Sequence, residues 1–217
     1  MTIAQEVAEK LLQINAVKLS PQNPFTWASG IKSPIYCDNR ITLYYPSVRD
    51  RIIDAFVEKS TQFGDFDLVA GVATAGIPHG ALIADRLKKP FIYIREKAKS
   101  HGRQNQIEGM PHSNTPQGIN ERLKVLVIED LISTGGSSLK AVEAVREAGM
   151  AVVGVLAIFT YGFEKADRMF KDANCPFDTL SNYDILIAQA IENQYIKSEE
   201  METLKAWRLS PETWGIK

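Results

Sequence analysis

The spacing of apolar residues changes along this chain, and each spacing is typical of one kind of element. Short apolar runs rich in β-branched residues are typical of strands buried on both faces of a parallel sheet. Apolar residues three and four positions apart are typical of helices with one buried face. The strand-like runs cover 66–72, 90–94, 125–128 and 151–159. The helix-like patterns cover 3–14, 46–59, a segment that ends near 87, 139–148, 165–171, 183–194 and 198–207.

Strands that alternate with helices in this way indicate an α/β fold. In such a fold a mostly parallel, twisted sheet is flanked by helices, and right-handed crossovers join its strands. The chain contains no internal repeat, low-complexity tract or linker. We therefore expect one domain that covers residues 1–217.

Composition and charge exclude some classes of protein. The 217 residues carry a net charge of -1, so bulk attraction to nucleic acid or to an anionic membrane is not expected. The N-terminus lacks the apolar core of a signal peptide, and no apolar run is long enough to cross a bilayer. The two cysteines lie far apart, which favours free thiols in a reducing cytoplasm, and the three histidines form no ligand cluster with them.

The stretch 125–138, VLVIEDLISTGGSS, carries the strongest chemical signal. The predicted strand is followed by Glu129 and Asp130, and then by the small, hydroxyl-bearing turn 133–137, which leads into a helix. The turn suits a phosphate because backbone N–H groups, hydroxyls and the positive end of a helix dipole meet there. The two carboxylates suit sugar hydroxyls or a hydrated cation. Each residue alone fits an ordinary connection, but the ordered string predicts a site for a phosphorylated sugar at the carboxyl end of a strand.

Two other segments follow predicted strands. The small-residue turn 73–78 suits an anion for the same reason, and a plain connection is the alternative. The long segment 95–118 is either functional or a solvated loop. Its first part carries near-alternating positive or chargeable side chains: Arg95, Lys97, Lys99, His101 and Arg103. Its place directly after a strand favours a lid that closes on a diphosphate.

Four fragments, FTWASGIKSPIY, GVATAGIP, IREKAKSHG and VIEDLISTGGSS, together resemble the type I phosphoribosyltransferase family. The first and third resemble its orotate branch, and the likeness covers most of the chain, from about 25 to 159. The resemblance implies transfer of the phosphoribosyl group of phosphoribosyl diphosphate (PRPP) to N1 of orotate in pyrimidine biosynthesis. It also implies the type I phosphoribosyltransferase fold with a small hood contributed mainly by about 1–45, Mg²⁺ as cofactor, and a cytoplasmic homodimer.

The resemblance also implies roles for particular residues. Catalytic roles fall on Arg95, Lys99 and His101, on a lid that reaches a neighbouring subunit's site. PRPP contacts are implied for these three and for Thr74, Ala75, Glu129, Asp130, Leu131, Ile132, Ser133, Thr134, Gly135, Gly136 and Ser137. Orotate contacts are implied for Ser133 and Lys32. Mg²⁺ is implied to have no direct protein ligand and to be held mainly through PRPP, with a water bridge to Asp130.

Three positions depart from the pattern of some family members. Ala28 and Ala75 stand where some members have Lys, and Tyr161 stands about where some have an Arg that contacts orotate. Two rival functions are a phosphoribosyltransferase for a purine, uracil or another base, and a PRPP-sensing regulator without catalysis. The regulator is expected to carry a DNA-binding helix-turn-helix or a basic face, and neither is visible in the sequence.

Overall fold

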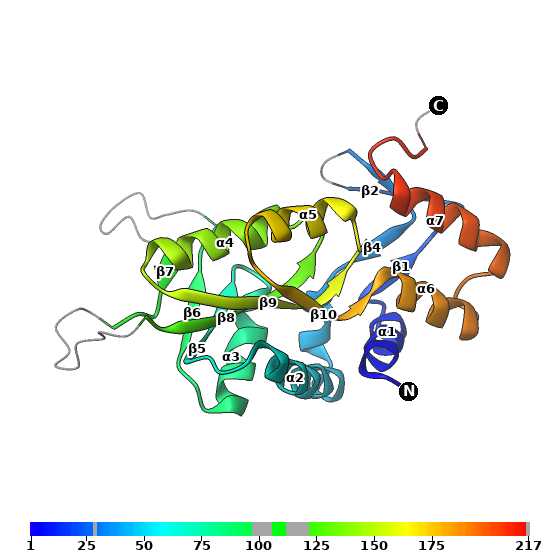
Figure 1. Cartoon of the computed structure of the whole chain (residues 1–217). Helices are drawn as coiled ribbons and strands as arrows, with labels where there is room; N and C mark the ends of the chain where they lie inside the picture. The colour runs from blue at the N-terminus through cyan, green and yellow to red at the C-terminus, as the bar shows by residue number, and fades with distance from the viewer. Residues whose placement is uncertain (28–29, 97–105, 112–121, 216–217) are drawn as a thin grey trace.

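A computed structural model describes residues 1–27, 30–96, 106–111 and 122–215 (Figure 1). A six-stranded sheet with the order β10-β9-β8-β5-β6-β7 lies at its centre. The strands are β5 (Leu68–Val72), β6 (Phe91–Ile94), β7 (Ile107–Glu108), β8 (Lys124–Ile132), β9 (Ala151–Thr160) and β10 (Phe177–Asn182). Neighbouring strands are parallel except for β6 and β7, which are antiparallel. The prediction of a mostly parallel sheet is confirmed.

Helices cover both faces of this sheet (Figure 1). On one face lie α2 (Pro46–Ser60) and α3 (Gly76–Leu87), and on the other lie α4 (Gly136–Glu147) and α5 (Glu164–Asp172). Near the β10 edge lie α1 (Ile3–Gln13), α6 (Tyr183–Glu192) and α7 (Met201–Leu209). Among the described residues, no helix has the length and apolar character needed to span a bilayer.

The sheet divides the core into two clusters of buried residues. Leu126 and Ile128 of β8 belong to the cluster under α2 and α3, whereas Val125 and Val127 belong to the cluster under α4 and α5. Successive side chains of a strand point to opposite faces, so a strand that is covered on both faces is apolar at every position. This burial explains why the central strands appear in the sequence as continuous apolar runs.

The N-terminal residues form two small antiparallel sheets beside the central one. β1 (Val17–Leu19) pairs with β4 (Ile35–Cys37), and β2 (Phe25–Thr26) pairs with β3 (Lys32–Ser33). A 3₁₀ helix, Asn39–Tyr44, follows β4. The C-terminal helix α7 lies against this group in Figure 1, and the indole Nε1 of Trp207 donates to the carbonyl oxygen of Lys32 at 3.1 Å.

The structure differs from the expected elements at several ends. β8 continues to Ile132 instead of ending at Ile128, because it stays paired with β9 as far as Thr160. The acidic pair therefore lies within the strand. The last predicted helix begins as a 3₁₀ turn, Ser198–Glu200, before α7. β4 fits the short strand that the punctuated segment 25–38 indicates, whereas β1, β2, β3, β7 and β10 were not among the predicted strands.

Candidate functional site

The turn between β8 and α4 leaves hydrogen-bond donors available. Gly135 has a φ of +84°, in the left-handed region that favours glycine, and there the chain turns into the helix. α4 begins at Gly136, and no side chain of the described residues caps its first turn. Thr134 and Ser137 are exposed. The first N–H groups of the helix and two hydroxyls are thus available to an anion.

The Glu129 side chain is buried and held in one position. It is 5% exposed, its Oε1 accepts a hydrogen bond from the N–H of Asp130 at 3.1 Å, and its Oε2 accepts one from Ser138 Oγ at 3.4 Å. Burial, followed by repulsion from the Asp130 carboxylate, raises the pKa of Glu129 well above its usual range. This environment favours a ligand that brings hydroxyl donors or positive charge to the carboxylates.

Asp130 is tied to the segment that follows β4. Its carbonyl oxygen accepts a hydrogen bond from Nδ2 of Asn39 at 2.7 Å, and Asn39 is fully buried. Burial raises the pKa of the Asp130 carboxyl, whereas the nearby Arg40 guanidinium opposes that rise. Arg40 is held in turn by Asp38, with Nε and Oδ1 2.7 Å apart. The short 3₁₀ helix after β4 therefore positions the backbone beside the acidic pair.

A second turn, between β5 and α3, lies next to the first. The Ala73–Thr74 peptide bond is cis, and the N–H of Ala73 donates to the carbonyl oxygen of Ile94, at the end of β6, at 2.8 Å. Thr74 is exposed and Ala75 is half-buried. The following helix again starts without a side-chain cap from the described part of the chain.

The two turns are adjacent because α3 approaches β8 closely. A Cβ atom at Gly76 would collide with the carbonyl oxygen of Ile128, and it would lie 3.4 Å from Cα of Glu129. Only glycine permits this approach. The uncapped start of α3 thus lies beside the acidic pair, at the carboxyl edge of the sheet.

Arg95, which follows β6, lies at that same edge. Its N–H donates to the carbonyl oxygen of Gln106 at 2.8 Å, and its guanidinium pairs with Glu108 at 3.5 Å. Lys99 and His101, the other two predicted catalytic residues, lie outside the described residues.

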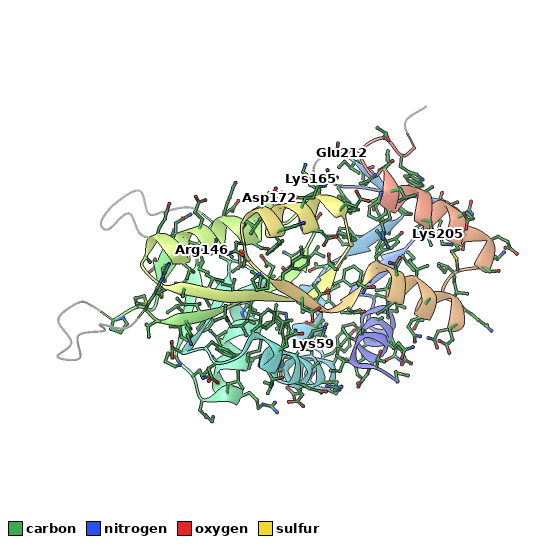
Figure 2. The ribbon with its side chains drawn as sticks, viewed as in Figure 1. Lys59, Arg146, Lys165, Asp172, Lys205 and Glu212 are labelled. Atoms are coloured by element: carbon green, nitrogen blue, oxygen red, sulfur yellow. The ribbon has the colours of Figure 1, made fainter. Side chains whose placement is uncertain are left out.

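A cavity of 620 Å³ borders the first turn, with Ser133 and Thr134 in its wall. Trp27, Ile31 and Phe163 give it an apolar surface. Its charged residues come from α5 and from the C-terminal segment: Glu164, Lys165, Arg168, Arg208 and Glu212. Figure 2 labels two of them, Lys165 and Glu212. A partly apolar cavity beside a phosphate-binding turn is suited to a flat base joined to the sugar phosphate.

Of the two predicted orotate contacts, only one lies among the described residues that line this cavity. Ser133 lines the cavity, but Lys32 is not among the described residues that do, and its Nζ donates to Oγ1 of Thr26 at 2.7 Å. Tyr161 is 3% exposed and packs against the rings of Trp27 and Trp207. Burial raises the pKa of the Tyr161 hydroxyl well above its usual range, so this side chain brings no charge to the site.

Most of the other predicted site residues meet at one edge of the sheet. These are Thr74, Ala75, Arg95, Glu129, Asp130 and the turn 133–137. Leu131 and Ile132 also lie there, but their side chains belong to the core, which leaves only their backbone groups for a ligand. Ala28 lies outside the described residues.

Sequence reasoning missed Asn39 and Ser138, which hold the acidic pair. Ser138 is the next hydroxyl after the predicted turn, so its position was a signal. No signal in the sequence indicated Asn39, because its hydrogen-bond partner Asp130 is 91 positions away.

This fold, with an acidic pair and an uncapped hydroxyl turn at the end of β8, defines the class of phosphoribosyltransferases, and residues 44–191 match the family described as phosphoribosyl transferase domain. The orotate phosphoribosyltransferase of Listeria monocytogenes serotype 4b is 56% identical over 216 residues, which are 99% of this chain and 100% of that protein. That of Staphylococcus saprophyticus is 56% identical over 95% of this chain and 98% of the relative. The chain belongs to the orotate phosphoribosyltransferase family.

Solved structures agree with this assignment. The crystal structure of orotate phosphoribosyltransferase from Aeropyrum pernix has a TM-score of 0.73 and 27% identity, and the match covers 88% of this chain and 99% of that one. The structure of Leishmania donovani UMP synthase has a TM-score of 0.77 and 25% identity, over 94% of this chain but 42% of that longer chain. The type I phosphoribosyltransferase fold expected from the sequence is confirmed.

Proposed function

We propose that this chain transfers the phosphoribosyl group of PRPP to N1 of orotate, releasing pyrophosphate and forming orotidine 5′-monophosphate in pyrimidine biosynthesis. The full-length identity to orotate phosphoribosyltransferases supports this activity. One structural observation carries it. The turn at the end of β8 has hydrogen-bond donors without partners among the described residues, and it contributes Ser133 and Thr134 to the partly apolar 620 Å³ cavity.

Each part of PRPP has a matching set of groups. The 5-phosphate binds the N–H groups and hydroxyls of 134–137 at the start of α4. The ribose hydroxyls donate to Glu129 and Asp130. The diphosphate binds the turn 73–76 at the start of α3, together with Arg95. Lys99 and His101 come from the lid, and the lid reaches the site of the second subunit in a homodimer.

The acidic pair suits Mg²⁺ that is bound mainly through PRPP. Carboxylate oxygens are ligands that Mg²⁺ prefers, but among the described residues no group of three or more His, Cys, Asp or Glu side chains could hold a metal. Asp130 would hold a hydrated ion through a bridging water, and PRPP would supply most of the ion's other ligands. When bound, the ion offsets the negative charge that develops on the departing pyrophosphate.

The protein's own role in the reaction is positioning and electrostatics. N1 of orotate is the nucleophile, so no protein nucleophile is required. Positive charge develops at C1 of the ribose as the bond to pyrophosphate breaks, and the carboxylates of Glu129 and Asp130 favour that charge. Arg95, Lys99 and His101 stabilise the leaving group, and closure of the lid excludes water that would hydrolyse PRPP.

The decisive experiment mixes the purified protein with PRPP and one base at a time, with Mg²⁺ and with EDTA. We expect a loss of orotate absorbance that depends on Mg²⁺, and no comparable turnover of uracil, adenine or hypoxanthine. Turnover of another base in place of orotate would overturn the substrate. Retention of DNA without turnover of any base would favour the regulator instead.

A complementation assay tests the shared lid. Lys99→Ala and Asp130→Asn are each expected to lose most activity. If the lid of one subunit serves the site of the other, mixing the two inactive proteins restores up to about a quarter of the wild-type activity, because one hybrid site is then intact. No recovery after subunit exchange, or a monomer in sedimentation, would contradict the shared site. We also propose a single domain over 1–217, with a hood mainly from about 1–45, and a cytoplasmic location.

A further inference from the structure

The 620 Å³ cavity beside the phosphate turn is where an acceptor base joins the sugar. It shares Ser133 and Thr134 with the turn, so a base on C1 of a ribose held by Glu129 and Asp130 enters this space. The rings of Trp27 and Phe163 are suited to cover a flat heterocycle. Orotate differs from uracil by one carboxylate, so a site that selects orotate needs a positive group in this wall.

Neither the predicted orotate contact Lys32 nor Tyr161, which stands about where some family members have Arg, supplies that group from the described cavity wall. Tyr161 is uncharged and buried among aromatic rings. The Lys32 ammonium is hydrogen-bonded to Thr26, and Lys32 is not among the described residues that line the cavity. Within the described part of the chain, the charge therefore comes from another element.

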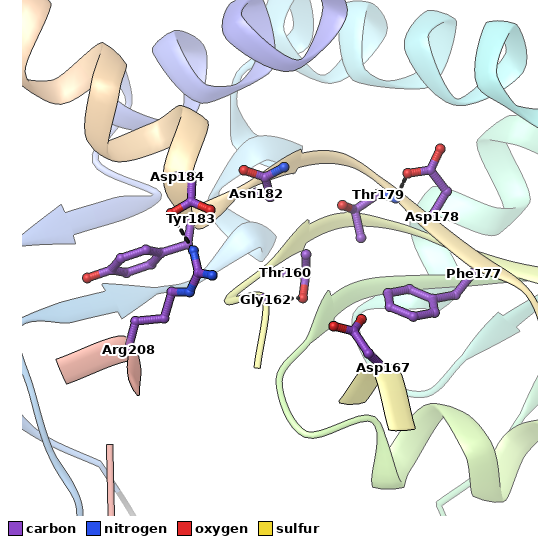
Figure 3. Close-up of a pocket in the computed structure, with 10 residues that line it drawn as sticks. All are labelled: Thr160, Gly162, Asp167, Phe177, Asp178, Thr179, Asn182, Tyr183, Asp184 and Arg208. Atoms are coloured by element: carbon purple, nitrogen blue, oxygen red, sulfur yellow. Dashed lines mark hydrogen bonds and ion pairs between the residues drawn. The ribbon is translucent and has the colours of Figure 1, made fainter. Parts of the chain in front are cut away.

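Among the described residues, three cations line the cavity, and two of them are already paired. Arg168 pairs with Glu164 on the same helix at 3.4 Å. Arg208 pairs with Asp184 at the start of α6, and Figure 3 shows this ion pair in a neighbouring polar cavity. Lys165 is exposed and has no hydrogen bond or ion pair to any described residue. Of the cavity's described cations, it is the one whose charge is available to a ligand.

The place of Lys165 on its helix supports a role beyond stability. It lies in the first turn of α5, where the helix dipole disfavours a positive side chain, whereas Lys171 lies in the favoured last turn. No described side chain caps this helix start. A carboxylate in the cavity would satisfy both the Lys165 ammonium and the uncapped N–H groups. Glu164 is paired with Arg168, and neither Glu164 nor Glu212 forms an ion pair with Lys165 within the described chain.

We propose that Lys165 binds the carboxylate of the acceptor base, and that it is the residue that selects orotate over bases without a carboxylate. This inference rests on the proposed function, because it assigns a residue to the acceptor in the same site.

Product binding tests the inference without requiring catalysis. Titration calorimetry compares orotidine 5′-monophosphate with uridine 5′-monophosphate, which lacks the carboxylate. Wild-type protein is expected to prefer the orotidine nucleotide by about 10- to 100-fold, as charge-assisted hydrogen bonds allow. Lys165→Gln is expected to remove most of this preference and leave uridine 5′-monophosphate affinity within about twofold. Lys165→Arg keeps the charge and is expected to retain the preference.

Kinetics with the wild-type and variant enzymes provide a second readout. For Lys165→Gln, kcat/KM for orotate is expected to fall by about 10- to 100-fold, while the KM for PRPP changes by less than about twofold. Lys171→Gln, on the same helix but outside the cavity, is the matched control and should behave as wild type. If wild type favours orotidine 5′-monophosphate and Lys165→Gln keeps that preference, the inference is wrong. If wild type binds neither nucleotide and does not use orotate, the proposed function itself fails.

Discussion

At the scale of single residues, Glu129 links the site to pH. Its pKa is raised in the folded protein, chiefly by burial, so the fold binds this proton more tightly than the unfolded chain does. The raised pKa stabilises the folded protein. This stabilisation is fully present below the pKa of the unfolded chain, about 4.3, and is lost as pH rises through the pKa of the folded protein.

We therefore predict that Glu129→Gln makes stability less dependent on pH above about 4.3. As pH rises, the wild type should lose up to about 1.4 kcal/mol per pH unit relative to the variant between the two pKa values. Urea unfolding across the pH range measures this difference, and parallel curves for the two proteins would contradict it. The variant should also bind PRPP more weakly, since an amide replaces a carboxylate beside the ribose.

His79 gives a pH effect of the opposite sign. This residue of α3 is fully buried, its ring lies 6.5 Å from that of Phe56, and neither ring nitrogen has a hydrogen-bond partner within the described chain. Burial lowers its pKa to about 4. The lowered pKa stabilises the folded protein with His79 neutral. This stabilisation is present above the pKa of the unfolded chain, about 6.5, and is lost as pH falls towards 4.

We predict that the wild type loses about 3 kcal/mol between pH 6.5 and 4 through this group alone. His79→Phe fills similar space without a titratable nitrogen, so it should remove that loss. Chemical denaturation at pH 7, 5.5 and 4 makes the comparison. An unchanged acid profile in the variant would show that His79 is not protonated on unfolding.

The residues of the proposed ribose and 5-phosphate site were visible in the sequence because they are contiguous. Glu129, Asp130 and the hydroxyl turn lie within one short string, and the fold keeps them together. The side chains that orient them were not visible. Asn39 contacts Asp130 because the 3₁₀ helix packs on β8. No local sequence pattern predicts this contact.

At the scale of elements, α4 depends on glycine at both ends. Gly135 before its first turn has φ +84°, and Gly149 after its last turn has φ +85°. A Cβ at Gly135 would lie 3.0 Å from the ring of Phe170, whereas one at Gly149 would meet nothing within 4 Å. The two sites share a backbone conformation and differ in their surroundings, so they form a matched pair.

Alanine at either position should cost about 1–2 kcal/mol of stability through the left-handed backbone alone. Gly135→Ala should cost more because of Phe170, and it should also weaken PRPP binding by about tenfold, since the helix start shifts away from the phosphate. Gly149→Ala should leave PRPP affinity unchanged. Thermal unfolding and PRPP titration of both variants test this, and equal PRPP affinities would show that the turn does not hold the phosphate.

The ends of the elements were harder to predict than their existence. The apolar run stops at Ile128, but β8 continues because its backbone remains paired with β9. β10 was missed because its sequence, FDTLSN, is largely polar, although Thr179, Leu180 and Ser181 are buried. Pairing with β9 explains both the extension of β8 and the existence of β10. A local sequence pattern does not show which strands pair.

At the scale of the whole molecule, Trp207 connects the C-terminal helix to the N-terminal strands. It is fully buried, its ring centroid lies 5.7 Å from those of Trp27 and Tyr161, and its indole N–H donates a hydrogen bond to the carbonyl oxygen of Lys32. The family resemblance implied a hood from the N-terminal segment. No local pattern predicted that α7 packs against that segment, because the contact joins residues 175 positions apart.

We predict that Trp207→Ala costs about 3–5 kcal/mol of stability and weakens orotidine 5′-monophosphate binding more than PRPP binding. Trp207→Phe keeps most of the ring and loses only the hydrogen bond, at about 1 kcal/mol. Denaturation and calorimetry of both variants measure these effects. Equal losses of affinity for the two ligands would contradict a role confined to the acceptor side.

The 620 Å³ cavity takes its walls from residues near both ends of the chain, with Trp27 and Ile31 on one side and 208–213 on the other. Every strand of the central sheet precedes the second wall in the sequence. Removal of residues 210–213 would therefore open the compartment for the base and leave the turn between β8 and α4 in place.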